Sequence, residues 1–208
     1  LKTLGINHYL THLNEGHAAF VLLEHIRRQV SSGSTFSEAS QRINRSTIFT
    51  THTPVAAGHD VFPFNMIEKY FHSYWPELGL SRDGFMQLGA HPEYPGNGFN
   101  MTAFALRLSG CRNAVSRRHA EVSRRMWRSL WPDTPEDSIP IDYVTNGVHV
   151  PTWTEPKMKL LLDRYLGEDW VERHDDRGLW ELIYNVPDNE LWQTHYWLKV
   201  KLIDAIRE

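Results

Sequence analysis

One stretch of the sequence decides the fold: Ser46-Thr47-Ile48-Phe49-Thr50-Thr51-His52-Thr53-Pro54. Its β-branched and aromatic residues are typical of a buried strand. Pro54 fixes the exit from this strand, and a loop follows through Gly58. The pattern therefore predicts a strand that delivers His52 to its carboxyl end.

Helical and extended segments alternate on both sides of this strand. Helices are predicted over residues 19–30, 37–43, 65–75, 100–108 and 114–130, and strands over 3–13, 46–53 and 141–144. Loops are predicted over 79–98, which is rich in proline and glycine, and over the acidic, proline-containing 132–140. From Glu155 on the chain is predicted to be helical, with Asp188 capping the last helix. This alternation favours a layered, helix-rich α/β fold.

The composition restricts the class of protein. With 208 residues and 41% hydrophobic content, the chain can bury a sizeable core. A net charge of −3 gives no whole-chain attraction to nucleic acid or to an anionic membrane. The arginine run from Arg107 to Arg128 is interpreted as a solvated face or as a surface that meets the rest of a longer protein. The single cysteine, Cys111, excludes an intrachain disulfide and is compatible with a reducing cytoplasm. No apolar run approaches the roughly 18 residues that span a bilayer.

Three groups of polar residues follow predicted strands, at junctions where open α/β sheets bind ligands. They are His12-Leu13-Asn14-Glu15-Gly16-His17, then His52-Thr53, then Thr145-Asn146-Gly147 with Trp153 beyond it. A histidine or asparagine in such a place can hydrogen-bond a sugar hydroxyl, and a tryptophan can pack against a ring. Taken alone, each group also fits a helix cap, a loop cap or a turn beside a core tryptophan.

The histidines also permit a metal-dependent hydrolase built on His12, His17, His52, His59 and His149. The spacing does not favour this interpretation, because His12 and His17 are five residues apart, whereas two metal ligands on one helical face are four apart. No metal site is therefore predicted.

Together the three groups resemble the α-glucan phosphorylase family, and the resemblance runs over nearly the whole chain. The order of the three groups matches that of the family, with Trp153 seven residues after Asn146. The amino-acid sequences of residues 12–20 and 51–60 are similar to those of bacterial and archaeal members. The resemblance implies part of a two-domain Rossmann-like fold of the GT-B type, mostly the second half of the N-terminal domain. Residues 1–153 would belong to that domain, and 154–208 would form a helical connection toward the next. The chain starts without methionine and ends within a predicted helix, so both ends are interpreted as cut.

The resemblance also implies an activity and roles for individual residues. The family cleaves the terminal α-1,4 bond of a glucan with inorganic phosphate and releases glucose 1-phosphate with retained configuration. By resemblance, His52 would hold the 6-hydroxyl of the reacting glucose, its carbonyl would stabilise the oxocarbenium-like transition state, and Asn146 would share the hydroxyl. Thr53 would line the same wall. Glu15 and His17 would contact the acceptor-side sugar, with Glu15 replacing an aspartate of the animal and plant branch, and Trp153 would pack near the cofactor.

Pyridoxal phosphate is the cofactor that the resemblance implies, acting through its 5′-phosphate. The family's Schiff-base lysine, its phosphate-binding Arg/Lys pair and its glycine-rich phosphate loop are not matched in this chain, so the chain alone is predicted to be inactive. The implied partners are an α-1,4-glucan and phosphate in the cytoplasm, with neither nucleic acid nor membrane. Association into a homo-oligomer remains open.

Two further alternatives are a cleft glycosyltransferase that uses a sugar nucleotide and a non-catalytic glucan-binding module. The first would need a nucleotide site outside this chain. The second would bind maltodextrin without catalysing phosphorolysis.

Overall fold

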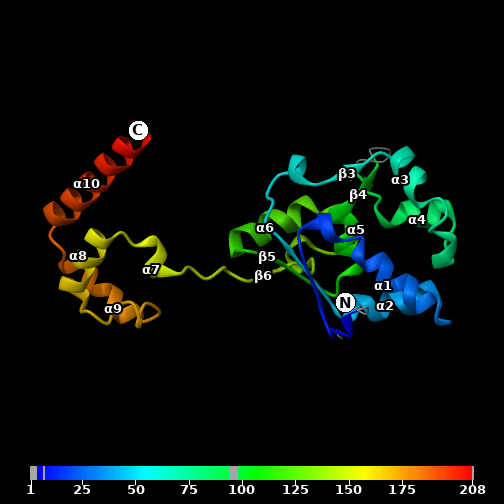
Figure 1. The fold of residues 1–208 in the computed structure, drawn as a ribbon, viewed down its shortest axis with the longest axis horizontal. Coiled ribbons are helices and arrows are strands. Elements are labelled where there is room, and N and C mark those ends of the chain that lie inside the picture. Colours follow the sequence, from blue (N-terminus) through cyan, green and yellow to red (C-terminus); the bar gives the residue numbers. More distant parts are fainter. Residues whose placement is uncertain (1–3, 7, 94–97, 208) are drawn as a thin grey trace. The chain divides into compact units, whose positions relative to one another are not determined.

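The computed structural model describes residues 4–6, 8–93 and 98–207, and the chain divides into two compact units, 1–146 and 147–208 (Figure 1). The first unit contains the main sheet and the second is helical. The assignment of residues 1–153 to a Rossmann-like domain, and of 154–208 to a connection between domains, stays a prediction.

A four-stranded parallel sheet forms the centre of the first unit. Its order is β1 (Thr11–Asn14), β2 (Thr47–Thr51), β5 (Cys111–Ala114) and β6 (Asp142–Tyr143). Asn14, Thr50 and Asn113 lie side by side across the first three strands. All four strands therefore deliver the following residues to one edge of the sheet, and the predicted α/β class is confirmed.

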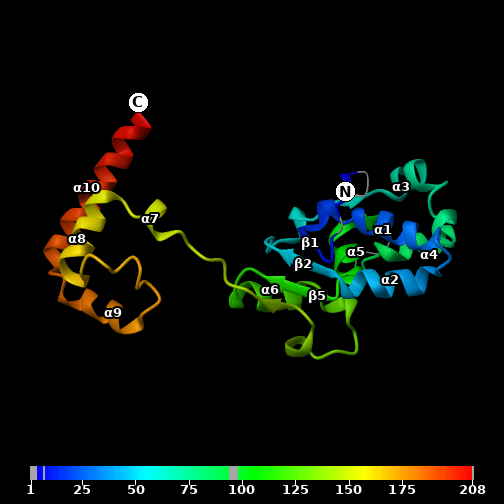
Figure 2. The ribbon, with the colours of Figure 1, turned by 60° about the horizontal axis from the view of Figure 1, so that its bottom comes forward.

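Helices pack on this sheet and build one apolar core (Figure 2). Leu22, Leu23 and Ile26 of α1 (Val21–Val30) are buried with Phe49 of β2. α2 (Phe36–Arg45) begins with a capping box in which the Thr35 hydroxyl and the Glu38 carboxylate bind each other's backbone N–H groups. The remaining helices of this unit are α3 (Phe64–Phe71), α4 (Arg82–Leu88), α5 (Met101–Leu108) and α6 (Arg117–Met126).

Short elements complete the first unit. β3 (Val61–Phe62) pairs antiparallel with β4 (Phe99–Asn100), directly before α5. Short 3-10 turns lie at Gly16–Ala18, Ala56–Gly58, Pro76–Leu78, Arg128–Leu130 and Glu136–Ser138, and in the second unit at Leu182–Asn185.

Three sequence predictions were wrong in detail. The strand predicted over 3–13 is limited to Thr11–Asn14, with residues 3 and 7 outside the described part of the chain. Residues 79–98 contain α4, which starts because the Ser81 hydroxyl accepts the N–H of Gly84. The long helix predicted over 114–130 begins at Arg117, because residues 111–114 form β5 and the Ser116 hydroxyl accepts the N–H of His119.

The second unit is helical, as predicted. It consists of α7 (Val150–Trp153), α8 (Pro156–Leu166), α9 (Arg177–Glu181) and α10 (Asp188–Arg207), around buried Leu162, Leu166, Trp170 and Leu179. The Asp163 carboxylate accepts hydrogen bonds from Lys159 and from the Trp170 indole N–H, which fixes α8 to the segment that follows it. Among the helices of the described ranges, none has both the length and the apolar character to cross a membrane.

Candidate functional site

The carboxyl edge of the parallel sheet gathers the first candidate residues. Glu15 directly follows β1, and His52 and Thr53 directly follow β2. β1 and β2 are neighbours in the sheet, so these three residues lie next to one another. Asn146 leaves from the same edge, three residues after β6, on an exposed segment.

The carboxylate of Glu15 joins the ends of the two strands. Its Oε1 accepts a hydrogen bond from the backbone N–H of His52 and another, 3.0 Å long, from the Thr53 hydroxyl. The same oxygen lies 3.7 Å from His52 Nδ1. The backbone N–H of Glu15 donates to the carbonyl of Thr50 at 2.9 Å. Glu15 therefore fixes the chain on both sides of the point where β2 ends.

The backbone of Glu15 is strained. With φ 64° and ψ 177°, it is the one non-glycine residue with a positive φ in the described part of the chain. Such a conformation costs roughly 1–3 kcal/mol and persists where the surroundings determine it. Gly16 adds to this constraint, because a Cβ there would lie 2.9 Å from Thr102 Oγ1 and 3.0 Å from Thr102 N. The turn is thus pressed against the start of α5.

The other candidate residues lie outside this hydrogen-bonded set. His17 stands on the 3-10 turn after Glu15, and its side chain is exposed. Trp153 ends α7 in the second unit and is 78% exposed. Glu15, His52 and Thr53 are therefore in direct contact, whereas His17, Asn146 and Trp153 present exposed side chains.

A row of polar side chains beneath this edge was not predicted from the sequence. His12 Nε2 lies 2.7 Å from Thr50 Oγ1, and the Thr50 hydroxyl donates to Asn113 Oδ1 at 2.8 Å. The three residues belong to β1, β2 and β5, so the row crosses the sheet. The polar residues of Cys111–Ala114 could have indicated it, had that segment been recognised as a strand.

The structure offers no ligand set for the metal-dependent alternative. Among residues 4–6, 8–93 and 98–207, no three His, Cys, Asp or Glu side chains are arranged to hold a metal ion.

Comparisons with known proteins find related sequences over the whole chain. It is 43% identical over 208 residues to the "Glycogen phosphorylase" of Aquifex aeolicus, which covers 100% of this chain and 30% of that protein. It is 42% identical over 207 residues to the "Maltodextrin phosphorylase" of Thermococcus litoralis, covering 100% of this chain and 24% of that protein. The "Glycogen phosphorylase" of Mycobacterium tuberculosis is 37% identical over 203 residues, 94% of this chain and 23% of that protein. No family model matches the chain.

These relatives confirm the resemblance predicted from the three groups of polar residues. The chain spans less than a third of their length, so it corresponds to a part of each protein. By this similarity along its sequence, the chain corresponds to an internal segment of glycogen and maltodextrin phosphorylases.

Proposed function

We propose that the protein of which this chain is a segment cleaves the terminal α-1,4 bond of glycogen or maltodextrin with inorganic phosphate. The product would be glucose 1-phosphate with retained configuration. One observation supports this above others: in a chain similar to phosphorylases throughout, the Glu15 carboxylate binds the His52 N–H and the Thr53 hydroxyl at the carboxyl edge of the sheet.

His52 has the geometry of a sugar contact. Its side chain is 38% exposed, so the imidazole can reach a ligand above the sheet edge. The proposed role of its carbonyl, facing the oxocarbenium-like transition state, requires a fixed peptide orientation. Glu15 supplies this by holding the residues on both sides of the His52–Thr53 peptide bond. Asn146 would share the 6-hydroxyl, since an amide both donates and accepts.

Glu15 therefore acquires a positioning role besides its proposed contact with the acceptor-side sugar. Oε1 carries the bonds to His52 and Thr53, and Oε2 would face that sugar together with His17. Because Glu15 is one methylene longer than aspartate, it can span the gap between β1 and β2 while its strained backbone keeps the strand end in place.

The residues that the structure describes include no buried lysine to hold pyridoxal phosphate, the cofactor we propose for the intact protein. Each lysine in the described ranges is exposed, and four of them lie over tryptophan rings or pair with a carboxylate: Lys157 over Trp197, Lys199 over Trp192, Lys159 with Asp163 and Lys201 with Glu155. A Schiff-base lysine instead needs a desolvated amine. In this chain Trp153 would contribute one wall near the cofactor, and the lysine would lie elsewhere in the intact protein.

We further propose the setting of the intact enzyme. It would adopt the two-domain GT-B fold, act in the cytoplasm on an α-1,4-glucan and phosphate, and have the capacity to form a homo-oligomer. Support comes from the parallel sheet, the sequence similarity and the single, exposed Cys111, which fits a reducing compartment.

An assay of the intact protein tests the reaction class. With maltodextrin, phosphate and added pyridoxal phosphate, we expect glucose 1-phosphate, and no glucosyl transfer from a nucleotide sugar. The 208-residue chain under the same conditions should yield none. Transfer from a nucleotide sugar without phosphorolysis would refute the proposal. Binding of maltodextrin without either reaction would favour the glucan-binding module.

A further inference from the structure

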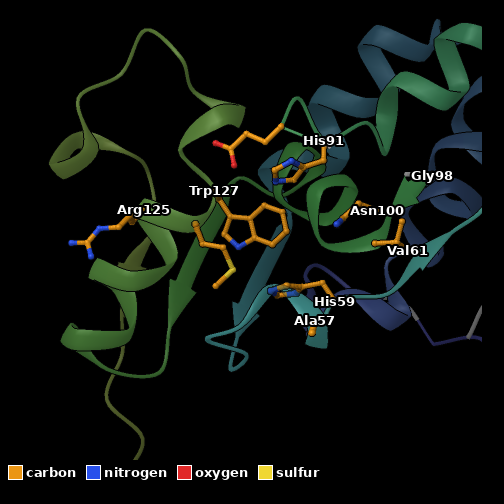
Figure 3. Close-up of a pocket in the computed structure, with 10 residues that line it drawn as sticks. Ala57, His59, Val61, His91, Gly98, Asn100, Arg125 and Trp127 are labelled. Carbon is orange, nitrogen blue, oxygen red and sulfur yellow. The ribbon is translucent and has the colours of Figure 1, made fainter. Parts of the chain in front are cut away.

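A cavity in the first unit is lined by residues other than Glu15, His52 and Thr53. Its volume is about 420 Å³, within the range of small-molecule sites (Figure 3). The polar lining residues His59, His91 and Asn100 and the aromatic Trp127 are each more than nine-tenths buried. Apolar side chains complete the wall: Ala57, Val61 and Met126.

His59 presents an unused polar atom to this cavity. Its Nδ1 lies 2.9 Å from the Thr102 hydroxyl, whereas its buried Nε2 has no hydrogen-bond partner within the described part of the chain. A buried polar group without a partner costs free energy, so such an atom indicates a missing ligand or water. Burial also lowers the pKa of both His59 and His91, which keeps these imidazoles neutral at pH 7.

The rings around the cavity do not form a slot for a flat heterocycle. The Trp127 indole lies between the two imidazoles in Figure 3, with ring centroids 4.9 Å from His59 and 5.3 Å from His91. The interplanar angles are 74° and 61°, so the imidazoles meet the indole edge-on. A nucleobase would need two parallel faces, which these rings do not provide.

The charges at the rim oppose an anionic ligand. Arg125 is 69% exposed, pairs with Glu136 at 3.4 Å and extends away from the imidazoles in Figure 3. The carboxylate of Glu93 also belongs to the lining and repels an anion. With neutral imidazoles inside, a neutral ligand that both donates and accepts hydrogen bonds fits this cavity better than phosphate does.

We propose that this cavity binds a neutral, hydroxyl-bearing ring of monosaccharide size, with His59 Nε2 as its hydrogen-bond partner and Ala57, Val61 and Met126 as its apolar wall. A hydroxyl group serves an imidazole nitrogen in either tautomer, and the C–H face of a sugar ring suits the aliphatic side. Its lining residues are other than Glu15, His52 and Thr53, and the proposal does not depend on the proposed phosphorolysis.

Two substitutions at His59 separate ligand binding from folding. His59→Asn keeps a polar atom near the position of Nδ1 for Thr102 and removes the group at Nε2. His59→Gln keeps a donor and acceptor near Nε2. Ala57→Trp blocks the cavity from an exposed position, and Ala205→Trp adds the same side chain at an exposed position of α10 as its control.

Titration of the 208-residue chain with D-glucose, read from the indole ¹H–¹⁵N signal of Trp127 in the cavity wall, tests the proposal. We expect a saturable shift of this Trp127 signal, with an affinity that weakens at least about tenfold in His59→Asn and in Ala57→Trp and persists in His59→Gln and Ala205→Trp. It should also persist in His52→Ala, which separates this site from the proposed reaction centre. The proposal is overturned if glucose leaves the Trp127 signal unchanged, if Ala57→Trp binds as the parent chain does, or if phosphate or adenosine shifts this signal and glucose does not.

Discussion

Glu15 combines a strained backbone with a carboxylate that binds two residues of the neighbouring strand's exit. Strain of this kind requires compensation, and here the hydrogen bonds to His52 and Thr53 and the close approach of Gly16 to α5 provide it. We interpret the strained turn as a device that holds the sheet edge in a fixed shape.

The contribution of the Glu15 carboxylate can be measured by paired substitutions. Glu15→Ala should lower the free energy of unfolding by about 2 kcal/mol, because hydrogen bonds to a charged acceptor are lost. Glu15→Gln should cost about 1 kcal/mol or less, since its amide oxygen still accepts. Both variants keep a side chain at the strained φ, so backbone strain cancels in the comparison. Urea unfolding checks this, and equal stability of Glu15→Ala and the parent chain would contradict it.

Gly16 offers an independent test of the same turn. Gly16→Ala should destabilise the first unit by about 2 kcal/mol, because its Cβ would collide with backbone as well as side-chain atoms of Thr102. Gly147→Ala is the matched control, since nothing lies within 4 Å of a Cβ there. Thermal unfolding of the two variants should differ clearly. A Gly16→Ala chain as stable as the control would show that the turn relaxes freely.

Among the elements, β2 was predictable and β5 was not. Thr47–Thr51 consists of β-branched and aromatic residues, which favour a strand irrespective of context. Cys111–Ala114 carries arginine and asparagine, and becomes a strand because β2 and β6 pair with it on both sides. The Arg112 guanidinium donates a hydrogen bond to the carbonyl of Leu106, and no local sequence pattern predicts this contact. α4 was hidden in the same way by its glycine-rich surroundings.

The sequence predicted where the residues of the candidate site lie, but not how they contact one another. The position of His52 at a strand end follows from local sequence, and so does that of Glu15. Their hydrogen bond depends on β1 and β2 being neighbours, which is a property of the whole sheet. The row from His12 through Thr50 to Asn113 and the cavity at His59 both join segments more than 35 residues apart, so periodicity could not reveal them.

The burial of His59 and His91 makes the free energy of unfolding depend on pH. Burial lowers the folded-state pKa of His59 and His91 below the ordinary value of 6.5, so the unfolded chain binds more protons as the pH falls. The contribution of these two histidines to the free energy of unfolding is present above pH 6.5 and is lost as the pH falls through their folded-state pKa values. Urea midpoints should be lower at about pH 5.5 than at about pH 7.5, with a smaller difference in His59→Asn. A midpoint that rises on acidification would contradict this.

At the scale of the whole molecule, the two units are joined by an exposed segment. Residues 144–149 form neither helix nor strand and are exposed, and the boundary between the units falls among them. Exposed segments of this kind are preferred sites of proteolysis. Limited digestion with elastase should first cut within this segment and leave two products that resist further cleavage. Mass spectrometry identifies the cut, and a first cut inside α5 or α8 would contradict the division.

The sheet edge that Glu15 and His52 form is the proposed glucose-binding wall, and the intact protein provides its most direct test. His52→Ala should reduce kcat/KM for phosphate-dependent release of glucose 1-phosphate from maltodextrin by about ten- to a hundredfold, through loss of the sugar contact. His72→Ala, an exposed histidine at the end of α3, is the control and should stay within about twofold of the parent enzyme. If His52→Ala releases glucose 1-phosphate as efficiently as His72→Ala does, the reacting sugar does not bind at this edge.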